Sequence, residues 1–183
     1  MIKKHYYSWE DIERACVDIT LQMYKDNWRP DYVVGITRGG NVPATILSNM
    51  LDVRGEALKV SLRDGSEQES NCWMSSDAFG YVPEEERKTY KTRWDISRRK
   101  NILIVDDIND TGATFNWIKQ DWQASCLPQE DSAWRSIWHN NVRFATITDN
   151  LASEFNGSVD YTTHELNKAE QDVWLVYPWE DVR

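Results

Sequence analysis

The sequence predicts a single α/β domain with a mostly parallel sheet and helices on both sides. Three observations support this fold class. Short runs rich in branched apolar residues occur at residues 32–36, 102–105 and 142–148. The first two runs end in a glycine-containing turn that precedes a helical pattern. The chain of 183 residues is long enough for one good core and too short for two. Alternating strand and helix signals of this kind are typical of a parallel sheet covered on both faces.

The first helix is predicted at residues 9–25. Ser8 and Asp11 have the spacing of a capping box, in which each side chain bonds the backbone of the other. Apolar residues then recur at intervals of three and four, at Ile12, Ala15, Ile19 and Met23. This spacing puts them on one helix face, which we expect to pack on the sheet.

The second element is a buried strand at residues 32–36. It ends in the turn Thr37-Arg38-Gly39-Gly40, and a helix is predicted to begin near Pro43, since proline is favourable in a first helical turn. Residues 57–62 predict a third strand.

Residues 63–100 show no sustained period and are rich in Ser, Glu and Asp. A segment of this length without clear secondary structure is usually disordered or a functional lid. It contains the aromatic residues Trp73, Phe79, Tyr81, Tyr90 and Trp94. We therefore expect a lid that packs against the domain at least part of the time.

The stretch 101–114 is the centre of the predicted domain. Its apolar run leads into Asp106 and Asp107 and then into a turn of small residues that opens a helix, predicted at residues 115–122. Exposed backbone N–H groups and the positive end of a helix dipole meet at such a junction. The turn therefore predicts a phosphate site, with the two acids placed at a sugar or a metal.

The remaining segments are predicted from weaker patterns. Residues 125–140 form an inserted loop with some helical turn, residues 142–148 a strand, and residues 158–162 a short strand.

Composition excludes several classes of function. The net charge of −9 disfavours binding to nucleic acid or an anionic membrane. No stretch has the ~18 apolar residues that span a bilayer, and the N-terminus lacks the apolar region of a secretory signal, so a cytoplasmic protein is expected. Cys16, Cys72 and Cys126 are odd in number and widely spaced, which indicates neither a disulfide framework nor a zinc site.

The central motif VDDINDTGAT, residues 105–114, resembles the phosphoribosyl-diphosphate (PRPP) signature of the type I phosphoribosyltransferases. Three other places resemble the bacterial xanthine-guanine branch of that family. They are the turn at 37–40 followed by Val42-Pro43, the terminal D-x-W-x-x-x-P-W-E pattern at 172–180, and the opening Tyr7-Ser8-Trp9-Glu10. Together these matches span nearly the whole chain.

The resemblance implies a fold and a reaction. The fold is a single phosphoribosyltransferase domain over residues 1–183, with a small hood made by the N-terminal segment and residues 150–183. The reaction displaces pyrophosphate from ribose C1 of PRPP with a ring nitrogen of a nucleobase, using Mg²⁺. A 6-oxopurine such as hypoxanthine, guanine or xanthine is the implied acceptor, as in purine salvage.

The resemblance also implies which residues bind PRPP. The 5′-phosphate would lie on the loop of Asp110, Thr111, Gly112, Ala113 and Thr114. Asp106 and Asp107 would bind the ribose hydroxyls, directly or through hydrated Mg²⁺, which prefers carboxylates and water. Arg38 and the Gly39 backbone would bind the pyrophosphate, where charge grows as the bond breaks.

The acceptor base has its own implied contacts. Asp110 would face N7 of the purine as a general base. Trp174 would stack on the base, and the Leu175 backbone would read the substituent at C2. Glu180 matches a carboxylate that can help hold a second magnesium in related enzymes, although a surface acid is the favoured interpretation.

Two departures from the family affect the predicted specificity. Members of the family usually have a lysine that reads O6 of the base, and its position falls here on or near Asn150. The asparagine amide can donate or accept a hydrogen bond but carries no fixed charge. A 6-amino base, a modified base or an acceptor that is not a purine therefore stays open. The long lid could bring Arg63, Arg93, Arg98 or Arg99 to the pyrophosphate, although such a loop is more often solvated.

Two other functions remain to be weighed against the enzyme. A PRPP-binding regulatory protein of the same fold is the main alternative, although the negative charge and the presence of Asp110 disfavour it. A PRPP synthase would need an ATP site that the sequence does not show. Relatives form dimers or tetramers, so a homo-oligomer is expected by analogy.

Overall fold

The computed structural model describes residues 2–60 and 72–180. Five parallel strands form its central sheet, in the order β3-β2-β4-β5-β6. Their bounds are β2 Tyr32–Thr37, β3 Arg54–Lys59, β4 Ile102–Asn109, β5 Val142–Asn150 and β6 Tyr161–Leu166. The predicted parallel sheet is confirmed. Because all strands run the same way, the chain leaves every strand at the same edge of the sheet.

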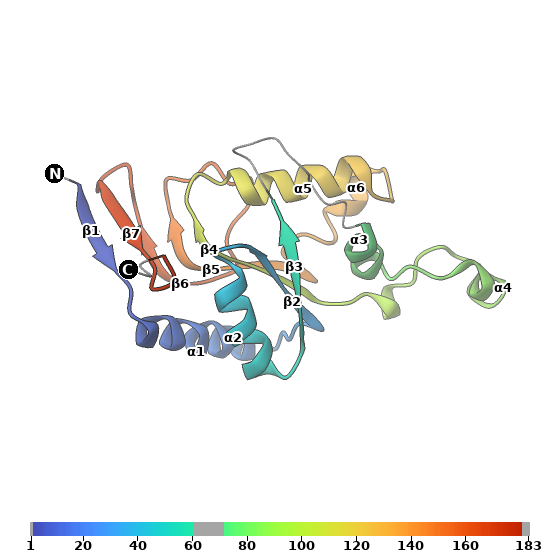
Figure 1. Ribbon diagram of the computed structural model, residues 1–183. Helices are drawn as coiled ribbons and strands as arrows, with labels where there is room; N and C mark the ends of the chain where they lie inside the picture. Colours follow the sequence, from blue (N-terminus) through green and yellow to red (C-terminus); the bar gives the residue numbers. More distant parts are fainter. Residues whose placement is uncertain (1, 61–71, 181–183) are drawn as a thin grey trace.

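Helices cover both faces of this sheet (Figure 1). On one face lie α1 Trp9–Lys25 and α2 Asn41–Leu51, and on the other lie α3 Cys72–Phe79, α5 Ala113–Ser125 and α6 Asp131–Trp134. Strand β4 shows the division clearly, because Ile102 and Ile104 belong to the core under α5, and Leu103 and Val105 to the core under α1. Burial on both faces explains why the strand is continuously apolar.

The first helix forms as its sequence predicts. Ser8 Oγ accepts a hydrogen bond from the Asp11 backbone at 3.1 Å, and Asp11 accepts one from the Ser8 backbone at 2.8 Å, which completes the capping box. Ile12, Ile19 and Met23 are buried against the sheet. The predicted bounds of 9–25 are confirmed.

The hood is a second, two-stranded parallel sheet at one end of the molecule. It pairs β1 Lys3–Tyr6 with β7 Val173–Val176, the blue and red strands at the left of Figure 1. Two tyrosines that follow these strands fasten the hood to β5. The hydroxyl oxygens of Tyr7 and Tyr177 lie 2.8 and 2.9 Å from Thr148 Oγ1.

The predicted lid at 63–100 is corrected over residues 72–100. These residues form α3, the short helices η1 Glu84–Glu86, α4 Arg87–Tyr90 and η2 Ile96–Arg98, and connecting turns. Met74, Ala78, Phe79 and Val82 are buried. Each helix is too short to produce a visible sequence period, so the pattern resembled a loop. Residues 63–71 of the predicted lid, including Arg63, lie outside the described residues.

The inserted segment at 125–140 also packs more closely than its sequence indicates. Trp134 and Ile137 are buried under α5, and Trp134 Nε1 donates to the Pro128 carbonyl at 2.8 Å. Strand positions differ by a few residues as well. The strand predicted at 57–62 begins at Arg54, and the one predicted at 158–162 begins at Tyr161.

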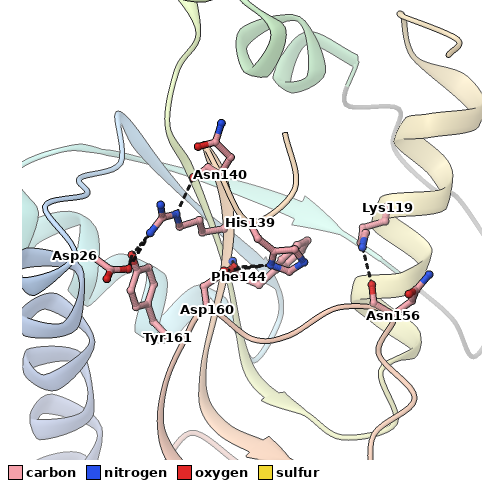
Figure 2. A network of polar contacts seen from close by, with 9 residues as sticks. Asp26, Lys119, His139, Asn140, Phe144, Asn156, Asp160 and Tyr161 are labelled. Atoms are coloured by element: carbon pink, nitrogen blue, oxygen red, sulfur yellow. Dashed lines mark hydrogen bonds and ion pairs between the residues drawn. The ribbon is translucent and has the colours of Figure 1, made fainter. Parts of the chain in front are cut away.

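A polar network at the amino edge of the sheet explains why β6 begins at Tyr161 and not at residue 158. Figure 2 shows Asp160 bound to the ring of His139, at 3.1 Å, and to the backbone of Phe144, at 2.8 Å. Next to it, the Tyr161 hydroxyl donates to Asp26 of the α1 C-cap at 2.9 Å. Asp160 thus fixes the end of the β5–β6 connection, and pairing begins at the next residue.

Cys72 and Cys126 form a disulfide, with their Cα atoms 5.2 Å apart. The expectation of no disulfide was wrong, because the spacing of the cysteines says nothing about where α3 packs. The bridge joins the start of α3 to the end of α5. Cys16 is free and buried in α1.

Within the described residues, no helix is long and apolar enough to cross a membrane.

Candidate active site

The residues predicted to bind PRPP gather at the carboxyl edge of the sheet. Arg38 follows β2, Asp106 and Asp107 lie near the end of β4, Asp110 follows β4, and Asn150 ends β5. In an open parallel sheet, the crevice at this edge is where ligands usually bind.

The predicted phosphate loop connects β4 to α5. Its Gly112 has a φ of +86°, and a Cβ there would lie 2.2 Å from the Phe155 backbone nitrogen. Only glycine fits, on grounds of both conformation and space. Thr111 and Ala113 are exposed and Thr114 is half-buried, so their hydroxyl and backbone groups at the α5 N-terminus are accessible to an anion.

Segment 152–156 is hydrogen-bonded to the 110–114 loop and to the first turn of α5. The Glu154 backbone donates to the Thr111 carbonyl at 2.9 Å, and Asn116 donates to the Glu154 carbonyl at 2.8 Å. Asn109 donates to both Asp149 and Ser153 at 2.8 Å. These residues could not be identified from the sequence, since their partners are about forty positions away and no motif links them.

The two acids on β4 are adjacent and half-buried. The Asp107 backbone donates to Asp106 Oδ1 at 2.9 Å, and the Ile108 backbone donates to Asp107 Oδ1 at 2.8 Å. Burial, and then the charge of Asp107, raises the pKa of Asp106 well above its usual value. Burial also raises the pKa of Asp107. A cation would relieve this repulsion, and two carboxylates that leave room for water and substrate oxygens suit Mg²⁺.

The 37–40 turn lies directly against the acid pair. A Cβ on Gly39 would lie 2.1 Å from Asp107 Oδ2, so glycine is required for this close approach. The Thr37-Arg38 peptide bond is cis, and the Arg38 side chain is exposed. The predicted pyrophosphate turn and the predicted ribose acids are therefore in contact.

Asp110 has a partner that no sequence motif indicates. Lys168 Nζ lies 2.9 Å from Asp110 Oδ1, and the two side chains are 28% and 45% exposed. Lys168 follows β6 by two residues, so the same edge of the sheet brings it to the site. No motif surrounds it in the sequence.

Asn150 is buried at 6% exposure, and its amide is bonded to three backbone groups. Its Nδ2 donates to the Asp110 carbonyl at 2.8 Å. Its Oδ1 accepts from the backbones of Ala152, at 3.1 Å, and Lys168, at 3.0 Å. To contact the base as predicted, the Asn150 amide would have to give up one of these three hydrogen bonds to the backbone.

The hood supplies the remaining predicted residues. Trp174 is 60% exposed on β7, which excludes a simple core role, while Leu175 is buried. The Tyr177 hydroxyl oxygen lies 3.2 Å from the Asp107 carbonyl oxygen, which connects the hood to the acid pair. Glu180 accepts a hydrogen bond from the Tyr177 backbone at 3.0 Å, so it closes the turn that positions this tyrosine.

The suggestion that Arg98 or Arg99 reaches the pyrophosphate was wrong for this arrangement. Both residues precede β4 and so lie at the amino edge of the sheet, opposite the site. Arg98 pairs with Glu86, and Arg99 lies over the Phe79 ring, 5.7 Å from its centroid.

Known proteins resemble the chain over nearly its whole length. It is 28% identical to the hypoxanthine-guanine phosphoribosyltransferase of Schizosaccharomyces pombe, over 96% of this chain and 88% of that protein. It is 26% identical to the xanthine-guanine phosphoribosyltransferase of Cereibacter sphaeroides, over 97% of this chain and 87% of that protein. The resemblance to purine enzymes, bacterial xanthine-guanine ones included, is confirmed.

The fold has solved counterparts. The purine phosphoribosyltransferase of Pyrococcus horikoshii superposes with a TM-score of 0.62 at 20% identity, over 100% of this chain and 97% of that one. The family model described as "Phosphoribosyl transferase domain" matches residues 3–176. The chain therefore belongs to the phosphoribosyl transferase domain family.

Proposed function

We propose that the chain transfers the 5-phosphoribosyl group from PRPP to a 6-oxopurine, giving a nucleoside monophosphate and pyrophosphate in purine salvage. The observation that carries this proposal is the contact between the 37–40 turn and the acid pair, beside the 110–114 loop. These three parts match the three charged or polar parts of PRPP. The named purine relatives support the choice of acceptor.

The donor is held by its 5′-phosphate in the 110–114 loop. Backbone N–H groups at the start of α5 and the hydroxyls of Thr111 and Thr114 provide the donors. Gly112 permits the close approach of the backbone to segment 152–156. The support from Asn109 and Asn116 keeps the loop in shape before the substrate arrives, which lowers the entropic cost of binding.

Asp106 and Asp107 bind the ribose hydroxyls and hold Mg²⁺. When bound, the metal supplies positive charge beside the ribose and the pyrophosphate. Arg38 and the Gly39 backbone N–H belong to the turn that contacts Asp107, and they stabilise the charge that develops on the leaving pyrophosphate. Glu180 is given no metal-binding role in this proposal, since its carboxylate accepts a hydrogen bond from the Tyr177 backbone.

The acceptor lies between Asp110 and the hood. Asp110 accepts the proton that the base loses as its ring nitrogen attacks ribose C1. The exposed face of Trp174 stacks on the base, and the Leu175 backbone reads the substituent at C2. A cytoplasmic location and a dimeric or tetrameric assembly complete the proposal, and family resemblance supports both.

A panel of acceptors tests this function. Hypoxanthine, guanine, xanthine, adenine, uracil and orotate are each incubated with PRPP and Mg²⁺, and nucleotide and pyrophosphate are measured. Turnover with at least one of the first three is expected. Tight PRPP binding without turnover of any base would instead support a PRPP-binding regulatory protein.

A further inference from the structure

Among the residues that the structure describes, Lys168 is the only cation that forms an ion pair with Asp110, the proposed general base. Its ammonium lies 2.9 Å from the Asp110 carboxylate, and both side chains are partly exposed. An ion pair of this exposure contributes little to stability, typically about 0–1 kcal/mol. Its position at the acceptor side of the site therefore calls for another explanation.

Asn150 fixes the relative positions of these two residues. One buried amide donates to the Asp110 carbonyl and accepts from the Lys168 backbone, at 2.8 and 3.0 Å. Asp110 follows β4 and Lys168 follows β6, so the amide joins two loops that the sheet separates by β5. The two hydrogen bonds of the Asn150 amide thus hold the Lys168 backbone next to Asp110, so the approach of the ammonium does not depend on the flexible side chain alone.

The pair has a definite chemical preference for its ligand. A carboxylate accepts a hydrogen bond from a ring N–H, whereas an ammonium can only donate. A base that satisfies both groups must present an N–H beside a carbonyl oxygen, as the N7–H and O6 of a 6-oxopurine do. An amino group at C6 would place its N–H donors next to the Lys168 ammonium. Neither donor would then have an acceptor.

We propose that Lys168 is a specificity-determining residue that selects acceptors with an oxygen next to the N–H facing Asp110, and that Asn150 positions it. This inference rests on the proposed transfer reaction. It gives Asn150 a structural task in place of the direct base contact that the sequence indicated. The cation comes instead from the loop that follows β6.

Lys168→Met tests the proposal, with Lys100→Met as a matched control. Lys100 also pairs with an aspartate, Asp77 at 3.0 Å, but it precedes β4 and lies at the opposite edge of the sheet. We expect Lys168→Met to lower kcat/KM for hypoxanthine by about 10- to 100-fold, the usual effect of losing a charge-assisted hydrogen bond. The preference for hypoxanthine over adenine should narrow, KM for PRPP should stay within about twofold, and Lys168→Arg should retain most activity.

Asn150→Ala tests the positioning role. The variant should raise KM for hypoxanthine more than it lowers kcat, and adding Lys168→Met to it should cause little further loss. A merely structural asparagine would give additive losses in the double variant. Thermal melting of each variant confirms that it is folded.

Two results would overturn the proposal. One is hypoxanthine turnover by Lys168→Met within about twofold of the parent protein, and the other is an equal loss for all bases with the preference unchanged. If the parent protein turns over no base, the proposed function fails, and calorimetric binding of hypoxanthine and adenine to the PRPP complex still tests the lysine. The proposed role of Lys168 would then be contradicted if Lys168→Met left the affinities for hypoxanthine and for adenine unchanged from those of the parent protein.

Discussion

Asp110 combines a main-chain role in the phosphate loop with a carboxylate on the acceptor side. We predict that Asp110→Asn lowers kcat by roughly 10²- to 10⁴-fold, the range of general-base catalysis, while PRPP affinity changes little. Steady-state kinetics and calorimetry with PRPP measure the two effects. Asp121→Asn, a carboxylate of α5 whose hydrogen-bond partner is Ser125 of the same helix, is the control. Unchanged turnover in Asp110→Asn would remove the general-base role.

Trp174 is exposed, so its removal should leave the core intact. We predict that Trp174→Ala raises KM for the base by about 5- to 100-fold, since stacking of a base on an aromatic ring contributes on the order of 1–3 kcal/mol. KM for PRPP should change much less. An equal rise in both constants would show that the tryptophan orders the whole site and does not stack on the base.

At the scale of residues, the sequence predicts the donor site well because its parts are contiguous. Asp106, Asp107 and Asp110 share one short motif with the phosphate loop. Lys168 could not be predicted, because it reaches the site only through the pairing of β6 with β5. The buried partners of Asn150 were hidden for the same reason.

At the scale of elements, long patterns succeeded and short ones failed. Helix α1 has seventeen residues, a capping box and an apolar face, and its bounds were predicted correctly. Helix α3 has eight residues, and its buried face includes Met74 and Phe79. Two turns of helix give too few repeats to distinguish it from a packed loop.

The hood gives a prediction at this scale. Nδ1 of His164 on β6 is hydrogen-bonded to the Tyr7 hydroxyl, and the centroid of the His5 ring lies 5.5 Å from that of His164. Burial, and then the charge of His5, lowers the pKa of His164 below 6.5. The unfolded chain therefore binds a proton at His164 more readily than the folded chain does. This contribution to stability is present above pH 6.5 and is lost as the pH falls from there through the folded-state pKa.

Urea unfolding at a series of pH values measures this effect. The free energy of unfolding of the parent protein should fall below pH 6.5, and that of His164→Gln should fall less steeply. The glutamine amide can still donate a hydrogen bond to Tyr7 or accept one from it. An identical pH dependence of the free energy of unfolding in the two proteins would show that protonation of His164 does not lower the stability.

At the scale of the whole molecule, the parallel sheet explains why distant motifs form one site. Arg38, Asp107, Asn150 and Lys168 come from four neighbouring strands of the sheet, β2, β4, β5 and β6, and each lies near or just after the carboxyl end of its strand. The alternation of strand and helix patterns was enough to predict the parallel sheet, but not the position of Lys168. How residues 72–100 and 125–140 pack was not predictable, since it depends on tertiary contacts among scattered aromatic residues.

The disulfide adds a prediction about the stability of the whole fold. Cys72 and Cys126 are separated by 54 positions, and closing a loop of this length stabilises the folded state by about 4 kcal/mol in the chain-entropy model. Reduction, or the double change Cys72→Ser and Cys126→Ser, should lower the free energy of unfolding by about this amount. Urea unfolding with and without reductant measures it. A reductant should have no further effect on the double variant.

The central claim is that the edge of the sheet carries out one complete transfer. The most direct measurement follows inosine monophosphate and pyrophosphate together in a reaction of hypoxanthine, PRPP and Mg²⁺. We predict equal amounts of the two products from the parent protein and a strongly reduced rate of both from Asp110→Asn. Pyrophosphate without nucleotide, or neither product despite bound PRPP, would contradict the claim.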